Sequence, residues 1–293
     1  MKERSFIKNL KNKDRLKNSF NSLAEKVFGI NFEGWYEKGY WNEKYTPFSY
    51  VDGNQVVANV SVNKMDLIIN RKLKRGLQIG TVMTHPDYRN QGLSASLMNK
   101  VLEEYENEYD VMYLFANHSV LDYYPKFGFT KVNEYQFSMD FRFQHSKPAD
   151  IQKLDVTNSK DLHFIHDFSS RRLPVSDCFG TINTQYLLMF YCLNVISEDL
   201  YYLPEENVIV IYKLERNELH VFDLISEVKV DVLTIIDKMA LKETDKVIFY
   251  FTPAIKDSQL KSELFHGSEV LFVRTYEDHK LPAQFKHPLT SQA

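Results

Sequence analysis

The sequence predicts a mixed α/β fold in two tandem copies, and three observations support this prediction. Residues 78–84 form an apolar strand that passes through a polar turn into an amphipathic helix, with apolar residues at helical spacing up to residue 105. Residues 111–116 form a continuous apolar run, as expected for a strand buried on both faces. The order of elements predicted for residues 55–141 recurs between residues 208 and 274, which indicates an internal repeat.

The length of the chain also favours two domains. Its 293 residues exceed the size of one ordinary domain. A change of composition around Pro148, Ala149 and Asp150 marks the predicted boundary. We therefore expect one domain over residues 1–147 and a second over residues 148–293.

Composition excludes several classes of partner. The formal net charge is −3, with 36 basic and 39 acidic residues, so no global field attracts nucleic acid or an anionic membrane. Cys178 and Cys192 lack metal-ligand spacing, and we predict no metal site. The sequence shows neither the apolar core of a secretory signal nor a run of the ~20 apolar residues that cross a bilayer. We expect a cytoplasmic protein, either monomer or homodimer.

The first predicted domain begins with helices. Residues 14–28 form an amphipathic helix with an apolar stripe, made of Leu16, Phe20, Leu23 and Val27. A second helix is predicted around the aromatic residues Trp35, Tyr36, Tyr40 and Trp41. These aromatic side chains either line a ligand pocket or pack in the core.

Strands follow these helices. Residues 49–51 and 55–62 flank the turn Asp52-Gly53-Asn54, which is a strong hairpin signal. Residues 65–70 predict a further strand, and the basic residues 71–75 predict a solvated turn before the central strand.

The turn after the central strand predicts an anion site. It contains Arg89-Asn90-Gln91-Gly92-Leu93-Ser94, which places a glycine where the next helix begins. Free backbone N–H groups at a helix start, together with the helix dipole, favour an anion such as a phosphate.

This region resembles the GCN5-related N-acetyltransferase (GNAT) family. The family signature is Arg or Gln, two residues, Gly, one residue and then Gly or Ala, after a strand that ends V-x-x-x-P-x-Y-R. The matching residues are Val82, Pro86, Tyr88, Arg89 and Gly92, whereas Ser94 replaces the usual Gly or Ala. The resemblance covers residues 15–141 and implies the acyl-CoA N-acyltransferase (GNAT) fold. The second half makes the protein similar to tandem members whose second copy is degenerate.

A second motif follows the apolar run at 111–116. Asn117 and Ser119 come directly after this run, and a short helix is predicted over residues 121–128 before a strand at 135–143. Residues 123–129 read Y-Y-P-K-F-G-F, which is similar to the F/Y-Y-x-x-x-G-F pattern of the family.

The resemblance implies a set of site residues for acetyl-CoA (coenzyme A). The backbone of Val82, Met83 and Thr84 would bind the pantetheine arm, in a slot where the two central parallel strands splay apart. The pyrophosphate would be bound by Arg89, Asn90, Gln91, Gly92, Leu93 and Ser94. Asn117 and Ser119 would contact the cofactor or cap the following helix. Tyr124 would act as general acid, although Pro125 beside it could shift its hydroxyl.

The second half predicts helices at residues 184–193, 230–241 and 258–265, and strands at 208–214, 219–225, 247–251 and 270–274. We call the turn at residues 89–94 the phosphate loop. Its counterpart in the second half, residues 226–230, has no glycine and contains Glu227. A carboxylate would occupy the place of the anion. We therefore expect this copy to lack cofactor.

These features favour an acetyl-CoA-dependent N-acetyltransferase that moves an acetyl group to a primary amine by direct attack. The alternative is a catalytically silent acyl-CoA-binding sensor or interaction module. A third class, an aminoacyl-tRNA-dependent transferase, is disfavoured because no strongly basic segment is present. The acceptor, a small-molecule or peptide amine, does not follow from the sequence. The general base is also left open between Glu33, Glu37, Asp122 and a water chain.

Overall fold

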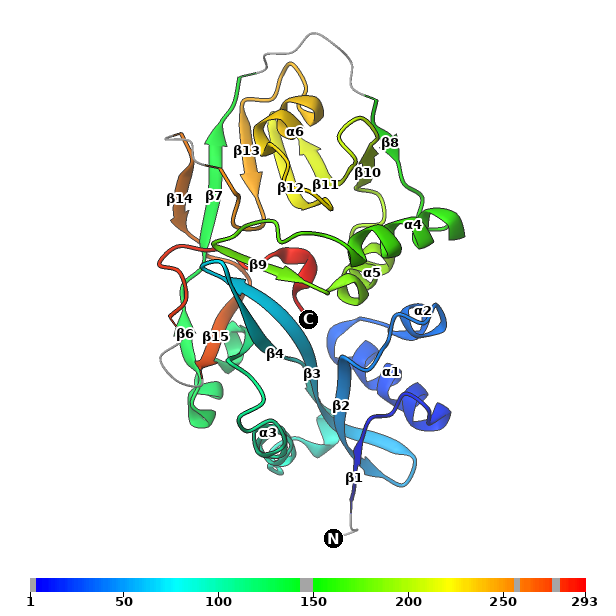
Figure 1. The fold of residues 1–293 in the computed structure, drawn as a ribbon. Coiled ribbons are helices and arrows are strands. Elements are labelled where there is room, and N and C mark those ends of the chain that lie inside the picture. Colours follow the sequence, from blue (N-terminus) through cyan, green and yellow to red (C-terminus); the bar gives the residue numbers. More distant parts are fainter. Residues whose placement is uncertain (1–3, 143–149, 256–258, 276–279) are drawn as a thin grey trace.

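A computed structural model describes residues 4–142, 150–255, 259–275 and 280–293 of the chain. The described residues form two mixed sheets with helices packed on and between them (Figure 1). Both sheets combine antiparallel strands with one parallel pair.

The first sheet has the strand order β1-β2-β3-β4-β5-β15-β6, and β9 pairs with the far part of β3. All its neighbours are antiparallel except β4 and β5, which run parallel. Its strands are β1 (Ser5–Lys8), β2 (Tyr45–Asp52), β3 (Gln55–Ile69), β4 (Lys72–Thr84), β5 (Val111–Asn117), β6 (Thr130–Val132), β9 (Phe179–Ile182) and β15 (Glu269–Thr275).

The second sheet has the order β14-β7-β13-β12-β11-β10-β8. Its one parallel pair is β12 with β13. Its strands are β7 (Tyr135–Asp140), β8 (Gln152–Lys153), β10 (Leu200–Leu203), β11 (Val208–Glu215), β12 (Glu218–Ile225), β13 (Lys246–Phe249) and β14 (Lys261–Leu264).

The helices connect and cover these strands. Helix α3 links the parallel strands β4 and β5, and α6 links β12 and β13, so the two sheets repeat one connection. The helices are α1 (Asp14–Phe28), α2 (Glu33–Glu37), α3 (Leu93–Glu104), α4 (Ser159–Ser170), α5 (Gln185–Asn194) and α6 (Val232–Met239), with short 3₁₀ helices η1 (Pro86–Tyr88), η2 (His118–Val120), η3 (Tyr124–Phe127) and η4 (Leu289–Ser291). In the described part of the chain, no helix is long and apolar enough to cross a membrane.

The two sheets exchange strands. Strand β7 follows the first sheet in sequence but pairs with β13 of the second, whereas β15 comes late in the chain and pairs with β5 of the first. Each exchanged strand occupies the same place, antiparallel beside the second strand of the parallel pair. The division between residues 147 and 148 stays a prediction. The two sheets are not separated at this point of the sequence, because each contains strands from both sides of it.

Most predicted elements are confirmed. Helix α1 has the predicted bounds, the turn at Asp52-Gly53-Asn54 joins β2 to β3, and β4 lies parallel to β5. In the second half, α5, α6, β11, β12, β13 and β15 lie where the sequence predicts them, with ends shifted by a few residues.

Several predictions are wrong. Residues 65–69 continue β3 instead of forming a separate strand, and most of the basic run at 71–75 belongs to β4. The helix expected at residues 258–265 is strand β14, because edge pairing with β7 outweighs the local preference. Residue 258 and the strand end expected at residue 143 lie outside the described residues. Helix α4 has an Asn158 N-cap and was missed.

The core covers both faces of the first sheet. Phe20 and Leu23 of α1 pack in one cluster, whereas Leu97 and Val101 of α3 pack in another. The cluster that contains Phe20 and Leu23 also contains residues of α5 and reaches Ile209 in the second sheet. One apolar core therefore joins the two sheets, and a third cluster packs α6 on the second sheet.

Candidate active site

A cavity opens where β4 and β5 separate. Their parallel pairing runs from Gly76 and Val111 to Ile79 and Leu114, but both strands continue beyond that point. The predicted splay is therefore confirmed. Ligands of open α/β sheets bind at this end of parallel strands.

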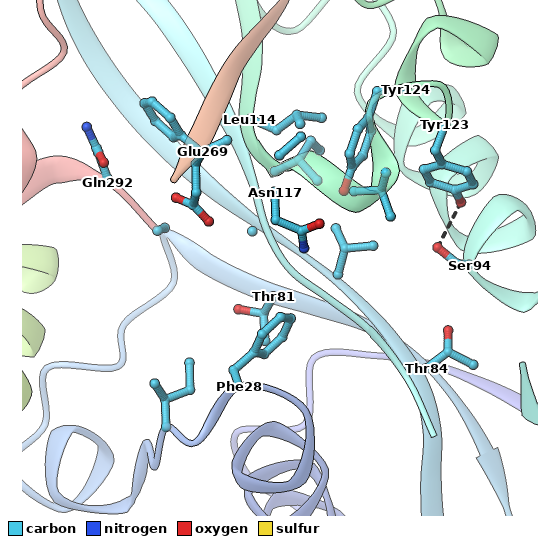
Figure 2. A pocket seen from close by; sticks show the side chains of 18 of the residues that line it. Phe28, Thr81, Thr84, Ser94, Leu114, Asn117, Tyr123, Tyr124, Glu269 and Gln292 are labelled. Carbon is cyan, nitrogen blue, oxygen red and sulfur yellow. Dashed lines mark hydrogen bonds between the residues drawn. The ribbon is translucent and has the colours of Figure 1, made fainter. Parts of the chain in front are cut away.

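The cavity has a volume of about 650 Å³, within the range of about 300–1,000 Å³ typical of small-molecule sites. Its wall combines the β4–α3 turn, the end of β5, the residues before η3, the segment around α2, and α5. Figure 2 shows the side chains of Thr81, Asn117, Tyr124 and Glu269 around one open space. Within the described residues, Arg89 and Glu269 are the charged side chains of the lining.

A β-bulge shapes the floor of the cavity. Residues 81 and 82 of β4 together face the single residue 60 of β3, and Thr81 has a positive φ of 49°. Its carbonyl oxygen accepts a hydrogen bond from Asn59 Nδ2 at 2.9 Å, and its Oγ1 lies 3.1 Å from the Tyr45 hydroxyl. A non-glycine residue in this region costs about 1–3 kcal/mol, so the surrounding bonds must fix it. A bulge leaves backbone groups without a hydrogen-bond partner on the neighbouring strand.

The predicted phosphate loop leads directly into α3. Asn90 and Gly92 have φ values of 60° and 73°, and α3 begins at Leu93. The loop contributes the cavity-lining residues Arg89, Asn90, Gln91, Gly92, Leu93 and Ser94. No side chain caps this helix start, so its first N–H groups are available to an anion.

The loop is braced by residues outside the motif. The Arg4 guanidinium donates a hydrogen bond to Gln91 Oε1 and lies 5.2 Å from the centre of the Tyr88 ring. The Tyr88 hydroxyl donates to Asp52 Oδ2 at 3.0 Å. These contacts place a second cation beside the turn that carries Arg89.

Tyr124 lies across the cavity from the floor. It is 5% exposed, and its ring packs edge-on to Tyr123 and Phe129. Burial, with the nearby Tyr123 and Glu269, raises the pKa of its hydroxyl, so the group is neutral at physiological pH. Within the described part of the chain, no side chain hydrogen bonds to this hydroxyl.

Pro125 interrupts no helical hydrogen bond next to Tyr124. Pro125 occupies the first turn of η3, where its missing N–H removes no helical bond. Gly128 ends the segment in a left-handed conformation with φ of 80°.

Comparison with known proteins identifies the fold around this cavity. Residues 7–132 match the family described as acetyltransferase (GNAT) domain. The chain contains a GNAT acetyltransferase domain. A domain of this family implies an acyl-CoA substrate.

Solved structures match the chain beyond the GNAT domain. A probable N-acyltransferase of unknown function from Enterococcus faecalis V583 has a TM-score of 0.64 at 15% identity, over 94% of this chain and 73% of that chain. Eis1 from Mycobacterium abscessus has a TM-score of 0.58 at 12% identity, over 93% and 73%. A GCN5-related N-acetyltransferase from Kribbella flavida has a TM-score of 0.56 at 14% identity, over 93% and 72%. These likenesses show the two-sheet fold. No curated protein gives a significant match.

Most residues predicted for the GNAT site lie together. Val82, Thr84, Asn117 and Tyr124 line the cavity with the whole phosphate loop. Their roles remain predictions.

Two of the predicted residues are absent from the described cavity lining. The Met83 side chain is buried in the core, so only its backbone could reach a ligand. Ser119 is absent from the described lining, and its N–H donates to Asn117 Oδ1 at 3.0 Å as part of a cap of η2.

The residues proposed for the acceptor pocket divide between the cavity and other parts of the fold. Trp35 lines the cavity, whereas Trp41 packs in the core with no exposed surface. None of the candidate bases Glu33, Glu37 and Asp122 lines the described cavity. Glu33 is instead paired with Lys17 at 2.8 Å.

The degenerate loop of the second copy lies between β12 and α6, as predicted. Its Glu227 is paired with Arg171, with 2.7 Å between Oε1 and Nη2. The start of α6 is capped instead by the carboxylate of Asp231, which accepts a hydrogen bond from the Leu233 N–H. Among the described residues, no group of three or more His, Cys, Asp or Glu side chains could bind a metal ion.

Sequence reasoning missed residues that the last part of the chain brings to the GNAT site. Gln292 and Ala293 line the cavity, and a Cβ at Gly80 would come within 3.1 Å of the Ala293 backbone. Glu269 begins β15 and lies opposite Asn117 in the sheet register. No local pattern identifies these contacts, because they depend on the strand exchange.

The last segment of the chain lies between the two sheets (Figure 1), and a buried polar network holds it there. Thr290 Oγ1 donates to Asp223 Oδ2, which also accepts from Arg172 at 2.7 Å. Ser291 Oγ lies 2.8 Å from Thr181 Oγ1. The network explains how residues 292 and 293 are held at the cavity.

Proposed function

We propose that the GNAT domain transfers an acetyl group from acetyl-CoA to a primary amine by direct attack, with Tyr124 as general acid. The observation that carries this proposal is the position of Tyr124. Its neutral hydroxyl, free of side-chain partners among the described residues, faces the same cavity as an uncapped helix start. An anion site and a proton donor are thus combined in one pocket.

The residues present fit a CoA ester. The N–H groups at the start of α3 and the Arg89 guanidinium suit a pyrophosphate, and the loop from Asn90 to Ser94 contains no acidic side chain. The apolar and aromatic surface deeper in the cavity suits a pantetheine arm and an acceptor. The bulge at Thr81 frees backbone groups of β4 for hydrogen bonds to the arm.

Acetyl-CoA supplies the acetyl group as a thioester. The acceptor gives up its ammonium proton to solvent water and attacks as the neutral amine, which forms the C–N bond and breaks the C–S bond. The further proton that this nitrogen loses passes to solvent and replaces the one that Tyr124 gives to the departing sulfur, so CoA leaves as the thiol. Tyr124 donates a proton to the departing sulfur, which requires a protonated hydroxyl, and its raised pKa ensures this state. The buried surroundings strengthen each electrostatic contact with the reacting groups.

Heat stability tests binding. A ligand present at 100 times its Kd and bound only to the folded state adds about 2.7 kcal/mol, so acetyl-CoA should raise the melting temperature. Gly92→Glu should abolish this shift by placing a carboxylate at the helix start. Gly39→Glu is the matched control, because Gly39 also has a positive φ and open space but lies outside the cavity lining.

Turnover is tested by release of free CoA from acetyl-CoA in the presence of a broad panel of amines. At least one amine should accelerate release in the parent and Gly39→Glu proteins. A protein that is stabilised by acetyl-CoA but releases no CoA with any amine would instead be a silent acyl-CoA-binding module.

A further inference from the structure

The deeper wall of the cavity is almost entirely apolar. It is formed by the segment around α2 and by α5, whose rings interlock: Phe190 lies 5.2 Å from Phe32 and 6.0 Å from Trp35 between ring centres. Phe28 adds a 43% exposed ring to the lining. The apolar and aromatic members of this wall are Phe28, Ile30, Phe32, Trp35, Leu187, Phe190 and Tyr191. Such a surface favours an acceptor with an apolar body.

Glu269 is the one acidic side chain of the described lining. It begins β15 opposite Asn117, and Figure 2 shows its carboxylate directed into the space shared with Asn117 and Tyr124. Its charge also raises the pKa values of Tyr124 and Tyr191. The carboxylate therefore lies close to the proposed proton donor.

This carboxylate is unpaired within the described part of the chain. No described side chain forms a hydrogen bond or an ion pair with Glu269. The side chain is exposed toward the cavity, yet surrounding protein removes much of its hydration and, with Glu134, raises its pKa. An unpaired charge in such surroundings is costly, and a cation bound beside it removes that cost.

A nearby lysine is already engaged. The Lys286 ammonium lies 3.2 Å from Glu134 Oε2 and 3.5 Å from the centre of the Phe265 ring. Both members of the Lys286–Glu134 pair are buried, so neither turns toward Glu269 without breaking a buried ion pair.

Resting on the proposed acetyl transfer, we propose that Glu269 binds the ammonium group of the acceptor, and that the acceptor is a monocation with an apolar or aromatic body. One carboxylate balances one ammonium. A polycation would bring further charges against the aromatic wall, where no described acidic side chain compensates them. Arg89, the other charged residue of the lining, would repel them.

Calorimetry on the CoA-loaded protein tests this inference independently of turnover. 2-Phenylethylamine should bind at least about tenfold more tightly than ethylamine, because its ring buries additional apolar area. It should also bind more tightly than spermidine. Tighter binding of spermidine, or no binding of 2-phenylethylamine, overturns the inference.

Glu269→Gln keeps the shape of the side chain and removes its charge. The Kd of 2-phenylethylamine should rise about 10- to 100-fold, as expected for loss of a charged hydrogen bond. Glu263→Gln is the control, because Glu263 is exposed on β14 outside the cavity lining. CoA affinity should be unchanged in both variants.

The two proposals fail in different ways. If Glu269→Gln binds 2-phenylethylamine as tightly as the parent does, the assignment of Glu269 is wrong, whether or not the protein turns over. If the parent binds this amine through Glu269 but releases no CoA, the acceptor assignment holds and the proposed catalysis fails.

Discussion

The Tyr123 hydroxyl lies 2.8 Å from the Oγ of Ser94, which ties the first turn of α3 to the segment that carries Tyr124 (Figure 2). Ser94 is the position where the sequence departs from the Gly or Ala of the family signature. The serine therefore has a structural partner that a smaller residue would lack. The contact joins the proposed phosphate site to the proposed proton donor.

Loss of this hydrogen bond should cost about 0.5–1.5 kcal/mol of unfolding free energy. Ser94→Ala and Tyr123→Phe each remove it, so the double variant should be little less stable than either single variant in urea unfolding. Additive losses would show that the two side chains do not interact.

The same helix offers a matched control for the activity of Ser94→Ala. Ser96 Oγ lies 2.8 Å from the Tyr50 hydroxyl, and neither residue lines the cavity. Ser96→Ala should lose similar stability and keep the parental kcat, whereas Ser94→Ala should lower kcat through the position of Tyr124. Equal kcat values in the two variants would contradict a link between Ser94 and the proton donor.

His287 makes stability depend on pH. Its ring is fully buried, with Nε2 3.0 Å from the Tyr113 hydroxyl and Nδ1 3.0 Å from the Pro288 carbonyl oxygen. These distances fit a neutral ring that donates from Nδ1 and accepts at Nε2. Burial lowers the pKa of His287 from 6.5 to about 3.

The His287 ring therefore binds a proton near pH 6.5 in the unfolded chain but only near pH 3 in the folded chain. The contribution of His287 to the free energy of unfolding is fully present above pH 6.5. It decreases as the pH falls, by about 2 kcal/mol between pH 7 and pH 5. His287→Gln should be less stable at pH 7 but should lose less stability on acidification, as measured by urea unfolding. The control His163→Gln replaces an exposed histidine and should keep the parental slope.

Local sequence patterns were sufficient to predict the frame of the site. The helical period of residues 14–28, the turn at residues 52–54 and the glycine before α3 are signals contained within short segments. The parallel neighbours β4 and β5 followed from a strand–helix–strand order, and the cavity followed from their separation.

The remaining features depend on distant pairings. Nothing within residues 261–264 indicates pairing with β7, and nothing within residues 269–275 indicates the first sheet rather than the second. The carboxylate of Glu269 precedes an apolar strand, which is a common pattern without functional meaning alone. The bulge at Thr81 likewise arises from its partners Asn59 and Tyr45, which lie on other strands.

Replacement of Tyr124 by Phe tests the proton donor with little change in packing. The ring contacts with Tyr123, Phe129 and Phe272 should remain, and only the hydroxyl is lost. We expect the rate of the chemical step to fall by about 10² to 10⁴-fold, the typical worth of general acid catalysis. Acetyl-CoA affinity should change far less, because the start of α3 and the bulged strand are intact. Pre-steady-state measurement with an active amine separates this step from product release, and a full rate in Tyr124→Phe would show that another group protonates the sulfur.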